Sequence, residues 1–380
     1  IQASIKEPER NFYLIVPEQY TMEAQRELVT MHPAGGMMNI DAIGMNRLAY
    51  RVFDELGIST GQVLEDFGKS MLIKKILCEQ QDTLQVYGSY YDKLGFVDEM
   101  KSMMSEIFQY NIKRDTINEI MEQIPEDSVV AGKMQDIRHI YEEFEAFAGE
   151  RYIVAEQLVE LLTRHVGQSK LVCGSSLYFD GFTGFTPVQL ELVEKLMTCA
   201  DDLTFSFTLD DRDQKYEHIK DYELFYLTKT TIKKLTEAAA AAGVEIESPV
   251  VLPGTINYRL GENRELFFLE RNLFRSPYQK WKQPLERIHL TATGDAQDEI
   301  VFVASTIRRL VREEGYRYKD IAIVAGDLEQ ASHIYERVMD EYEIPVFIDA
   351  NACLKANPCA ETIRSVLAVL ADDFSYDSVF

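Results

Sequence analysis

The first sixty residues alternate between short apolar runs and amphipathic stretches. Residues 12–16 (Phe-Tyr-Leu-Ile-Val) form a continuous apolar run, which is typical of a strand buried on both faces of a parallel sheet. A second strand is expected at 37–41, and Thr21 is expected to cap the helix between the two strands. Apolar residues recur with helical spacing over 45–56, which predicts an amphipathic helix. This order of elements indicates an α/β fold.

The pattern changes over residues 59–166, where strand signals disappear and several amphipathic helices follow one another. This stretch predicts an all-helical insertion, with helices for example at 94–110 and 134–147. The α/β pattern then returns, with a strand, a helix and a further strand expected at 176–180, from Pro187 and at 203–209.

The second half of the chain begins with a predicted helix at 219–242 that ends at Gly243, followed by a mixed connector with a helix near 263–274. A new α/β unit is expected from about residue 287. Its spacing predicts right-handed parallel crossovers, with strands at 288–293, 321–324 and 346–348 and helices around 300–311 and 328–341.

A chain of 380 residues is long enough for two or three domains. The elements divide it into a first α/β domain in two parts, an insertion, a connector, the start of a second α/β domain and a further helical region. The corresponding ranges are 1–58 and 167–215, 59–166, 216–286, 287–350 and 351–380. Because the chain starts at Ile1 and stops within an unfinished pattern at Phe380, we expect it to be cut from something longer.

The chain is acidic, with 39 Lys and Arg against 63 Asp and Glu and a net charge of −24. This balance argues against a small, basic nucleic-acid binder but leaves room for a local basic groove. No apolar run reaches the roughly 20 residues of a membrane span, and no signal peptide is recognisable. The five cysteines form no CxxC pair, so we expect reduced thiols in a cytoplasmic protein, no metal site and no membrane partner.

Most chemical motifs fail on inspection. Residues 68–70 (Gly-Lys-Ser) suggest a phosphate loop, but Val63 stands where that loop needs glycine, and Glu65 and Asp66 would repel phosphate. The capped start of a helix in the insertion is the favoured interpretation. The adjacent acids at 201–202 and 210–211 are expected to be solvated strand ends rather than a metal site. No residue is therefore predicted to be catalytic.

Several segments taken in order resemble the motifs of UvrD/RecB-like helicases. Residues 14–21 (LIVPEQYT) resemble motif Ia, residues 40–51 the following motif, and residues 177–189 and 203–211 lie where motifs II and III fall. Residues 296–346 resemble the opening of the second motor domain. Within that superfamily the chain is similar, over nearly its whole length, to the B subunits of AddAB-type ATP-dependent helicase–deoxyribonucleases.

The resemblance implies a P-loop-NTPase-like (helicase-like) α/β fold with parallel sheets and a large helical insertion. It also implies a bacterial, nucleoid-associated complex that processes double-strand breaks for recombinational repair, with DNA and an A subunit as partners. The family's phosphate loop would lie before residue 1, and its nuclease domain and iron–sulfur cysteines beyond Phe380. ATP, magnesium and the iron–sulfur cluster are thus implied for the full complex and no cofactor for this chain.

The motif II segment departs from the family of working helicases, because Asp180-Gly181 stands where those enzymes have Asp-Glu. Glycine cannot deprotonate or orient the attacking water. We therefore expect a degenerate nucleotide pocket, braced by Gln189, and no ATPase, helicase or nuclease activity of this chain alone. The neighbouring aromatics Phe179, Phe182 and Phe185 are expected to pack rather than to stack on bases.

Residues that follow the first two strands are candidates for DNA contact, because parallel α/β folds bind ligands at the carboxyl ends of their strands. Hydroxyls and amides can position phosphates there, and aromatic rings can stack on bases. The candidates are Gln19, Tyr20, Thr21, Asn46, Arg47, Tyr50 and Arg51. Alternatively, Thr21 only caps a helix, and Arg47 and Arg51 cover a solvated face or pair with Asp54 and Glu55.

Two rival functions stay open. A fragment of an active superfamily 1 helicase would need Asp210 or Asp211 to replace the missing glutamate. A non-enzymatic interaction scaffold that never touches DNA is favoured by the net charge of −24. Clustering of Lys and Arg on one surface would argue against such a scaffold.

Overall fold

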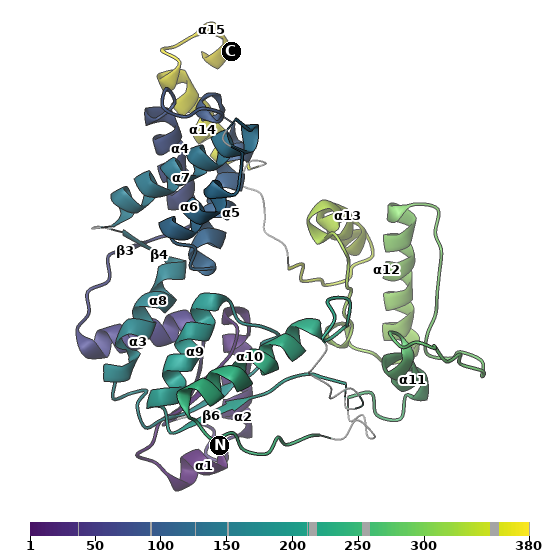
Figure 1. The fold of residues 1–380 in the computed structure, drawn as a ribbon. Coiled ribbons are helices and arrows are strands. Elements are labelled where there is room, and N and C mark those ends of the chain that lie inside the picture. Colours follow the sequence, from purple (N-terminus) through teal and green to yellow (C-terminus); the bar gives the residue numbers. More distant parts are fainter. Residues whose placement is uncertain are drawn as a thin grey trace. The chain divides into compact units, whose positions relative to one another are not determined.

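A computed structural model of the protein describes residues 1–36, 38–91, 93–125, 127–149, 152–210, 212, 219–252, 259–349 and 357–379. The chain divides into two compact units, Ile1–Tyr258 and Arg259–Phe380 (Figure 1). The first unit contains two hydrophobic cores, one around a parallel sheet and one within the helical insertion. The second unit has a smaller core of its own.

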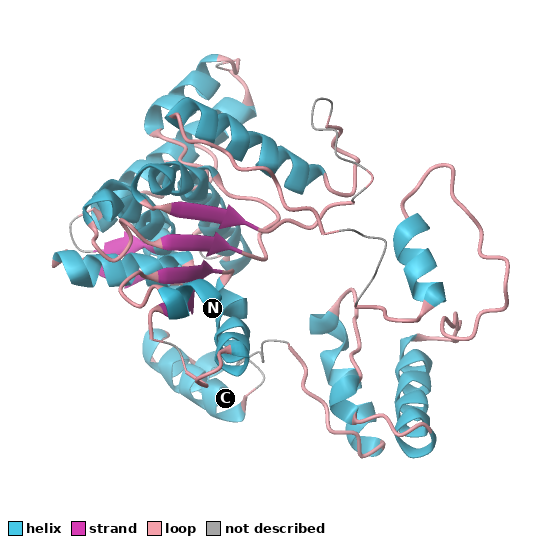
Figure 2. Ribbon diagram, turned by 90° about the horizontal axis from the view of Figure 1, so that it is seen from below, coloured by secondary structure: helices cyan, strands magenta, loops and turns pink. Residues whose placement is uncertain are grey.

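A four-stranded parallel sheet organises the first unit (Figure 2). Its order is β2-β1-β5-β6, formed by Ile40–Ile43, Phe12–Ile15, Ser176–Phe179 and Asp202–Phe205. The central strand β1 pairs with both β2 and β5, so that Ile15 lies opposite Ile43 on one side and Phe179 on the other. The predicted parallel α/β fold is confirmed.

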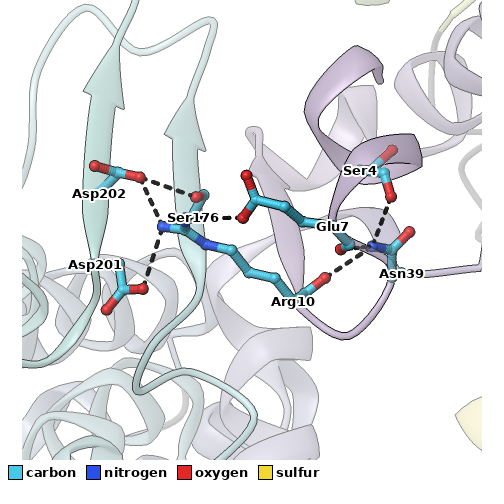
Figure 3. A network of polar contacts seen from close by, with 7 residues as sticks. All are labelled: Ser4, Glu7, Arg10, Asn39, Ser176, Asp201 and Asp202. Carbon is cyan, nitrogen blue, oxygen red and sulfur yellow. Dashed lines mark hydrogen bonds and ion pairs between the residues drawn. The ribbon is translucent and has the colours of Figure 1, made fainter.

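Two of the strands, β2 and β6, differ from their predicted ranges by more than one residue. β2 begins at Ile40 instead of 37, since the Asn39 amide donates hydrogen bonds to the carbonyls of Ser4, Glu7 and Arg10 and so shapes the turn before the strand (Figure 3). Met37, where the strand was expected to start, lies outside the described residues. β6 ends at Phe205 instead of 209, because its pairing with β5 stops where Phe205 lies opposite Phe179, the last residue of β5.

Helices α3 (Met45–Leu56), α8 (Ala155–His165) and α9 (Pro187–Cys199) contribute buried residues to the sheet core. The predicted apolar stripe of α3 is buried as expected, including Leu48, Val52 and Phe53. Helix α2 (Thr21–Met31) connects β1 to β2 and has no buried residue. Because right-handed crossovers lead in opposite directions from β1 and from β5, α2 and α9 lie on opposite faces of the sheet. Helix α10 (Tyr226–Ala242) packs against α9.

The insertion is built from four helices around its own core: α4 (Asp66–Glu79), α5 (Leu94–Gln109), α6 (Arg114–Glu122) and α7 (Val129–Ala148). Its prediction as all-helical was wrong in one respect. β3 (Gln62–Leu64) and β4 (Tyr152–Val154) form a parallel pair where the insertion joins the sheet domain. Three-residue strands are too short for an alternating pattern, so the sequence carries little signal for them.

Buried polar groups hold the insertion together and join it to α8. The Asp136 side chain accepts hydrogen bonds from the backbone N–H groups of residues 85–87 at 2.8, 2.8 and 2.9 Å. The Lys69 ammonium, whose side chain is 4% exposed, donates to Glu156 at 2.9 Å and to Ser105 at 3.0 Å. Residues 68–70 therefore lie in the first turns of α4 and form no phosphate loop, as the sequence predicted. The expected side-chain cap at the start of this helix is absent.

A charged network joins the amino ends of three strands (Figure 3). The Arg10 guanidinium, just before β1, contacts Asp202 at 2.6 Å, Glu7 at 3.3 Å and Asp201 at 3.4 Å. The Ser176 hydroxyl at the start of β5 donates to Asp202 at 3.3 Å. The adjacent acids at 201–202 thus align strand ends through arginine, in agreement with their strand-end prediction. α1 (Gln2–Lys6) and the 3-10 turns η2 (Gly88–Tyr90) and η3 (Val166–Gln168) complete the unit.

In the second unit, the two predicted helices form as α12 (Ala296–Glu313) and α13 (Leu328–Glu341) and share a core. Asp295 and Asp327 cap the two helices. The other elements are α11 (Arg264–Asn272), η4 (Tyr318–Asp320), α14 (Pro358–Ala371) and α15 (Tyr376–Val379). The strands predicted at 288–293, 321–324 and 346–348 are not formed. Leu290, Val324 and Phe347 are 101%, 96% and 88% exposed, and a parallel strand needs neighbours that would bury such residues.

The Lys69–Glu156 pair provides a stability test of the insertion. We expect Lys69→Met to lower the free energy of unfolding by about 3 kcal/mol, because the Glu156 carboxylate loses its main partner inside the protein. The double variant Lys69→Met/Glu156→Leu should recover most of this loss. Urea unfolding followed by circular dichroism measures both effects. The exposed Lys74→Met serves as the control, and equal effects at 69 and 74 would contradict a structural role for the pair.

Candidate nucleic-acid interface

The carboxyl ends of β1, β2 and β5 meet at one edge of the sheet. The chain leaves β1 through Val16 and Pro17 into the 3-10 turn η1 (Glu18–Tyr20), which leads directly into α2. It leaves β2 through Gly44 into α3, and it leaves β5 at Asp180. This edge includes the gap between β1 and β5, where the connections turn in opposite directions and where such folds bind ligands.

Glu18 brings two of these chain segments together. Its carboxylate accepts a hydrogen bond of 3.1 Å from the backbone N–H of Asn46 in the first turn of α3. A β-carbon at residue 44 would approach the Glu18 carboxyl carbon to 2.1 Å, so the contact requires Gly44. The negative charge also complements the positive end of the helix dipole. Through this contact the predicted groups at 19–21 and 46–50 become neighbours.

The predicted contact residues at 19–21 differ in how available their side chains are to a ligand. Gln19 and Tyr20 are exposed, and the Tyr20 side chain is 50% accessible. Thr21 is the first residue of α2 and its hydroxyl donates to the Glu18 carbonyl at 2.9 Å, so the expected cap is wrong. The Thr21 hydroxyl thus stabilises η1, while Gln19 and Tyr20 remain available for a ligand.

In the second group, Arg47 and Tyr50 lie three residues apart on the outer face of α3 and are both exposed. In the described part of the chain no acidic side chain pairs with Arg47. Arg51 is different, because its guanidinium pairs with Asp41 of β2 and contacts the Tyr13 hydroxyl. Burial raises the pKa of Tyr13, and the Arg51 charge lowers it in part. Arg51 therefore holds α3 to the sheet, and neither arginine pairs with Asp54 or Glu55.

The degenerate pocket lies at the end of β5. Asp180 is exposed, receives a hydrogen bond from the Ser206 hydroxyl, and donates its backbone N–H to the Ile15 carbonyl at 3.0 Å. Gly181 has a φ of +78°, in the left-handed region that favours glycine. A β-carbon there would make only ordinary contact with the Pro17 ring at 3.4 Å, so the constraint lies in the backbone angle. The backbone at this position is thus suited to glycine and poorly suited to a glutamate.

Gln189 is occupied by a capping box at the start of α9. Its side-chain oxygen accepts from the Thr186 N–H at 3.0 Å, while its own N–H donates to the Thr186 hydroxyl at 3.3 Å. This local pairing explains the residue through helix formation. A role as a brace for the pocket has no supporting contact among the described residues.

The aromatic residues near Asp180 form a packed cluster, as predicted. Phe179 stacks on Phe205 at 4.7 Å between ring centroids, and Phe182 and Phe185 stack at 5.1 Å. Phe182, Phe185 and Phe205 are half-buried against the sheet core. They are not freely exposed platforms.

The rival interpretation as an active helicase needs a carboxylate to replace the missing glutamate. Asp210 accepts hydrogen bonds from the Arg212 side chain at 3.0 Å, so its charge is paired. Asp211 lies outside the described residues. A site with Gly181 and a paired Asp210 does not fit the magnesium-dependent activation of water.

No metal-binding group of three or more His, Cys, Asp or Glu occurs among the described residues. Burial and the neighbouring Cys173 thiol raise the pKa of Cys199 to about 11, so this sulfur is protonated at neutral pH. In the same described part of the chain, no helix is both long and apolar enough to cross a membrane.

A doubly wound parallel sheet with a polar carboxyl edge and a helical insertion is an α/β architecture that is compatible with a helicase-like protein. The model of the family described as "ADDB, N-terminal" matches residues 1–270, and the chain belongs to this family. The resemblance inferred from the sequence motifs is thereby confirmed.

Relatives named as the B subunit of an ATP-dependent helicase/deoxyribonuclease align with nearly the whole chain. The protein of Lachnoclostridium phytofermentans is 39% identical over 383 residues, which is 100% of this chain and 33% of the relative. That of Acetivibrio thermocellus is 31% identical over 367 residues, 97% of this chain and 32% of the relative. That of Alkaliphilus metalliredigens is 31% identical over 388 residues, covering 100% and 33%. The chain spans about a third of the length of these curated relatives.

Gly181 allows a direct test of the pocket's backbone. We expect Gly181→Ala to lower the free energy of unfolding by roughly 1 kcal/mol, because a left-handed φ is strained for any residue with a β-carbon. Thermal and urea unfolding measure the change. Gly184→Ala is the matched control, since a β-carbon there meets only ordinary contact with Thr231 at 3.5 Å. Equal stability of the two variants would refute the strain at 181.

Proposed function

We propose that this chain is the helicase-like module of the B subunit of an ATP-dependent DNA helicase–exonuclease. In that complex it would guide single-stranded DNA along the carboxyl edge of its sheet and offer a docking surface to the A subunit. The complex would process double-strand breaks for recombinational repair in the bacterial cytoplasm. The names of the relatives support the helicase and deoxyribonuclease context.

The single observation that carries the DNA role is the Glu18 contact with the first turn of α3. This contact brings two groups of side chains close together: the Gln19 amide and the Tyr20 ring after β1, and the Arg47 guanidinium and the Tyr50 ring on α3. Such a mixture can hold phosphates through Arg47 and Gln19 and stack bases on Tyr20 and Tyr50. Since Glu18 already occupies the end of the helix, a phosphate would bind beside it, at the Arg47 side chain, rather than at the helix N-terminus.

The same geometry supports a non-catalytic module. Gly181 supplies no general base and Asp210 is paired with Arg212. ATP with magnesium and an iron–sulfur cluster belong in this proposal to other parts of the complex, with the A subunit as the motor. The alternative, an interaction scaffold that never touches DNA, is still supported by the net charge of −24. A DNA-binding experiment distinguishes it from the DNA-guiding module.

DNA binding at the sheet edge is tested by fluorescence anisotropy of a labelled single-stranded oligonucleotide, titrated over a salt series. We expect binding that weakens with salt, because cations that neutralise phosphates release counterions. Arg47→Ala should make the slope of log K against log salt concentration shallower by about 1, the amount expected for the loss of one phosphate contact. Tyr20→Ala should weaken binding by roughly tenfold, because the stacking of its ring on a base is lost. Lys74→Ala, an exposed lysine on α4, is the control. If the parent chain does not bind the oligonucleotide at low salt, the assignment of DNA contacts to residues 19–21 and 46–50 is wrong. That result would favour the interaction scaffold that never touches DNA.

The absence of a motor function is tested separately. We expect no magnesium-dependent, DNA-stimulated ATP hydrolysis by the purified chain, because no carboxylate stands at residue 181. Release of inorganic phosphate is the measurement, and Asp180→Ala is the control. Hydrolysis that is lost in Asp180→Ala would show an active pocket and favour the superfamily 1 helicase alternative.

A further inference from the structure

A basic and aromatic loop follows helix α11 in the second unit. Residues 273–285 (LFRSPYQKWKQPL) contain Arg275, Lys280 and Lys282 and no acidic residue, although the whole chain has a net charge of −24. The segment thus differs in sign from the rest of the molecule. Aromatic residues alternate with these cations, which is a pattern typical of surfaces that bind single-stranded nucleic acid.

The side chains of this loop are displayed to solvent. Phe274 and Tyr278 are 71% and 70% exposed. Lys280 and Lys282 are also exposed, and in the part of the chain that the structure describes neither is paired with an acidic group. Exposed aromatic rings cost free energy unless a ligand covers them. Exposed rings beside unpaired cations favour a ligand that carries both negative charges and flat rings, as a nucleic acid does, over a purely apolar ligand.

The end of the loop is held in place by hydrogen bonds to helix α11, so the fold itself keeps the loop residues exposed. Glu265 in the first turn of α11 is 8% exposed. Its carboxylate accepts hydrogen bonds from the backbone N–H groups of Glu286 and Arg287, both at 2.8 Å. These backbone donors lower the pKa of Glu265, so the anchor stays charged at neutral pH. The carboxylate therefore ties the end of the loop back to the start of the helix that precedes it.

A second contact holds the middle of the loop. The Trp281 ring packs against Phe268 of α11 at 5.2 Å between centroids, with the planes at 58°. Trp281 is half-buried, whereas Phe274 and Tyr278 point outward. One aromatic residue thus anchors the loop and two remain available.

We propose that the loop 273–285 is a binding site for single-stranded DNA. In this site Phe274 and Tyr278 stack on unpaired bases, and Lys280 and Lys282 neutralise the adjacent phosphates. The proposal rests on the DNA role proposed above but assigns a separate contact to residues of the second unit, in addition to the predicted residues at 19–51 of the first unit. Single strands are favoured over duplex DNA, because stacking on an exposed ring requires bases that are not already stacked in a helix.

Trp281 provides an internal probe, since it is the one tryptophan of the chain. Titration of the chain with unlabelled oligo-dT should change the tryptophan emission, and the apparent affinity should fall as salt rises. The same oligonucleotide annealed to its complement should bind at least several-fold more weakly. Equal binding of single-stranded and duplex DNA would overturn the stacking role.

Variants of the loop test the assigned contacts. We expect Phe274→Ala/Tyr278→Ala to weaken binding by roughly tenfold or more, and Tyr278→Phe to retain it because the ring is kept. Lys280→Glu/Lys282→Glu should weaken binding and flatten its salt dependence. The controls are Tyr222→Ala, a residue 77% exposed elsewhere, and Lys233→Glu/Lys234→Glu on α10. Unchanged binding in the loop variants, with unchanged thermal unfolding, would refute the proposal.

The two DNA sites can fail independently. If Arg47→Ala weakens binding while Trp281 emission stays constant at saturating DNA, the sheet edge binds DNA and the loop does not. In that case the inference is wrong. If Trp281 responds and the loop variants lose binding while Arg47→Ala binds normally, the loop site stands and the edge assignment falls.

Discussion

The parallel pairing of β1 with both β2 and β5 is the constraint on which the rest of the first unit depends. Parallel neighbours cannot be joined by tight turns, so each step between strands needs a crossover. The long crossover from β2 to β5 accommodates the helical insertion without disturbing the sheet. The same pairing places all carboxyl ends at one edge, where the polar residues after β1, β2 and β5 meet.

Carboxylates perform much of the positioning in this acidic chain. Glu18 binds the first turn of α3, Asp136 binds three consecutive N–H groups, and Glu265 closes the basic loop. Glu55 does the same for the turn before β5, where it accepts from Lys170 N–H at 2.8 Å. In each case a side chain from one element satisfies backbone donors of a distant segment, which would otherwise need water. Part of the negative charge is therefore structural.

The candidate site follows from this division of labour. Charges that hold the fold, such as Arg51 on Asp41, are unavailable to a ligand, whereas Arg47 on the outer face of the same helix is available. Similarly, Gly181 has a left-handed φ at the end of β5, and this backbone conformation disfavours a glutamate at that position. This arrangement supports the proposal that the module guides a ligand rather than hydrolysing one.

The pattern of apolar residues by itself predicted strands at 12–16 and 176–180 and a helix at 45–56, and these form within one residue of the predicted bounds. The motif resemblance identified the family. These signals are local, because strand and helix periodicities act over a few residues. Tertiary structure decided what distant groups do. The contact of Glu18 depends on Gly44, which follows a different strand of the sheet. The Gln189 side chain caps its own helix instead of bracing the pocket. The strands expected at 288–293, 321–324 and 346–348 did not form, because an extended apolar segment becomes a sheet strand only where neighbours supply its hydrogen bonds and cover its faces.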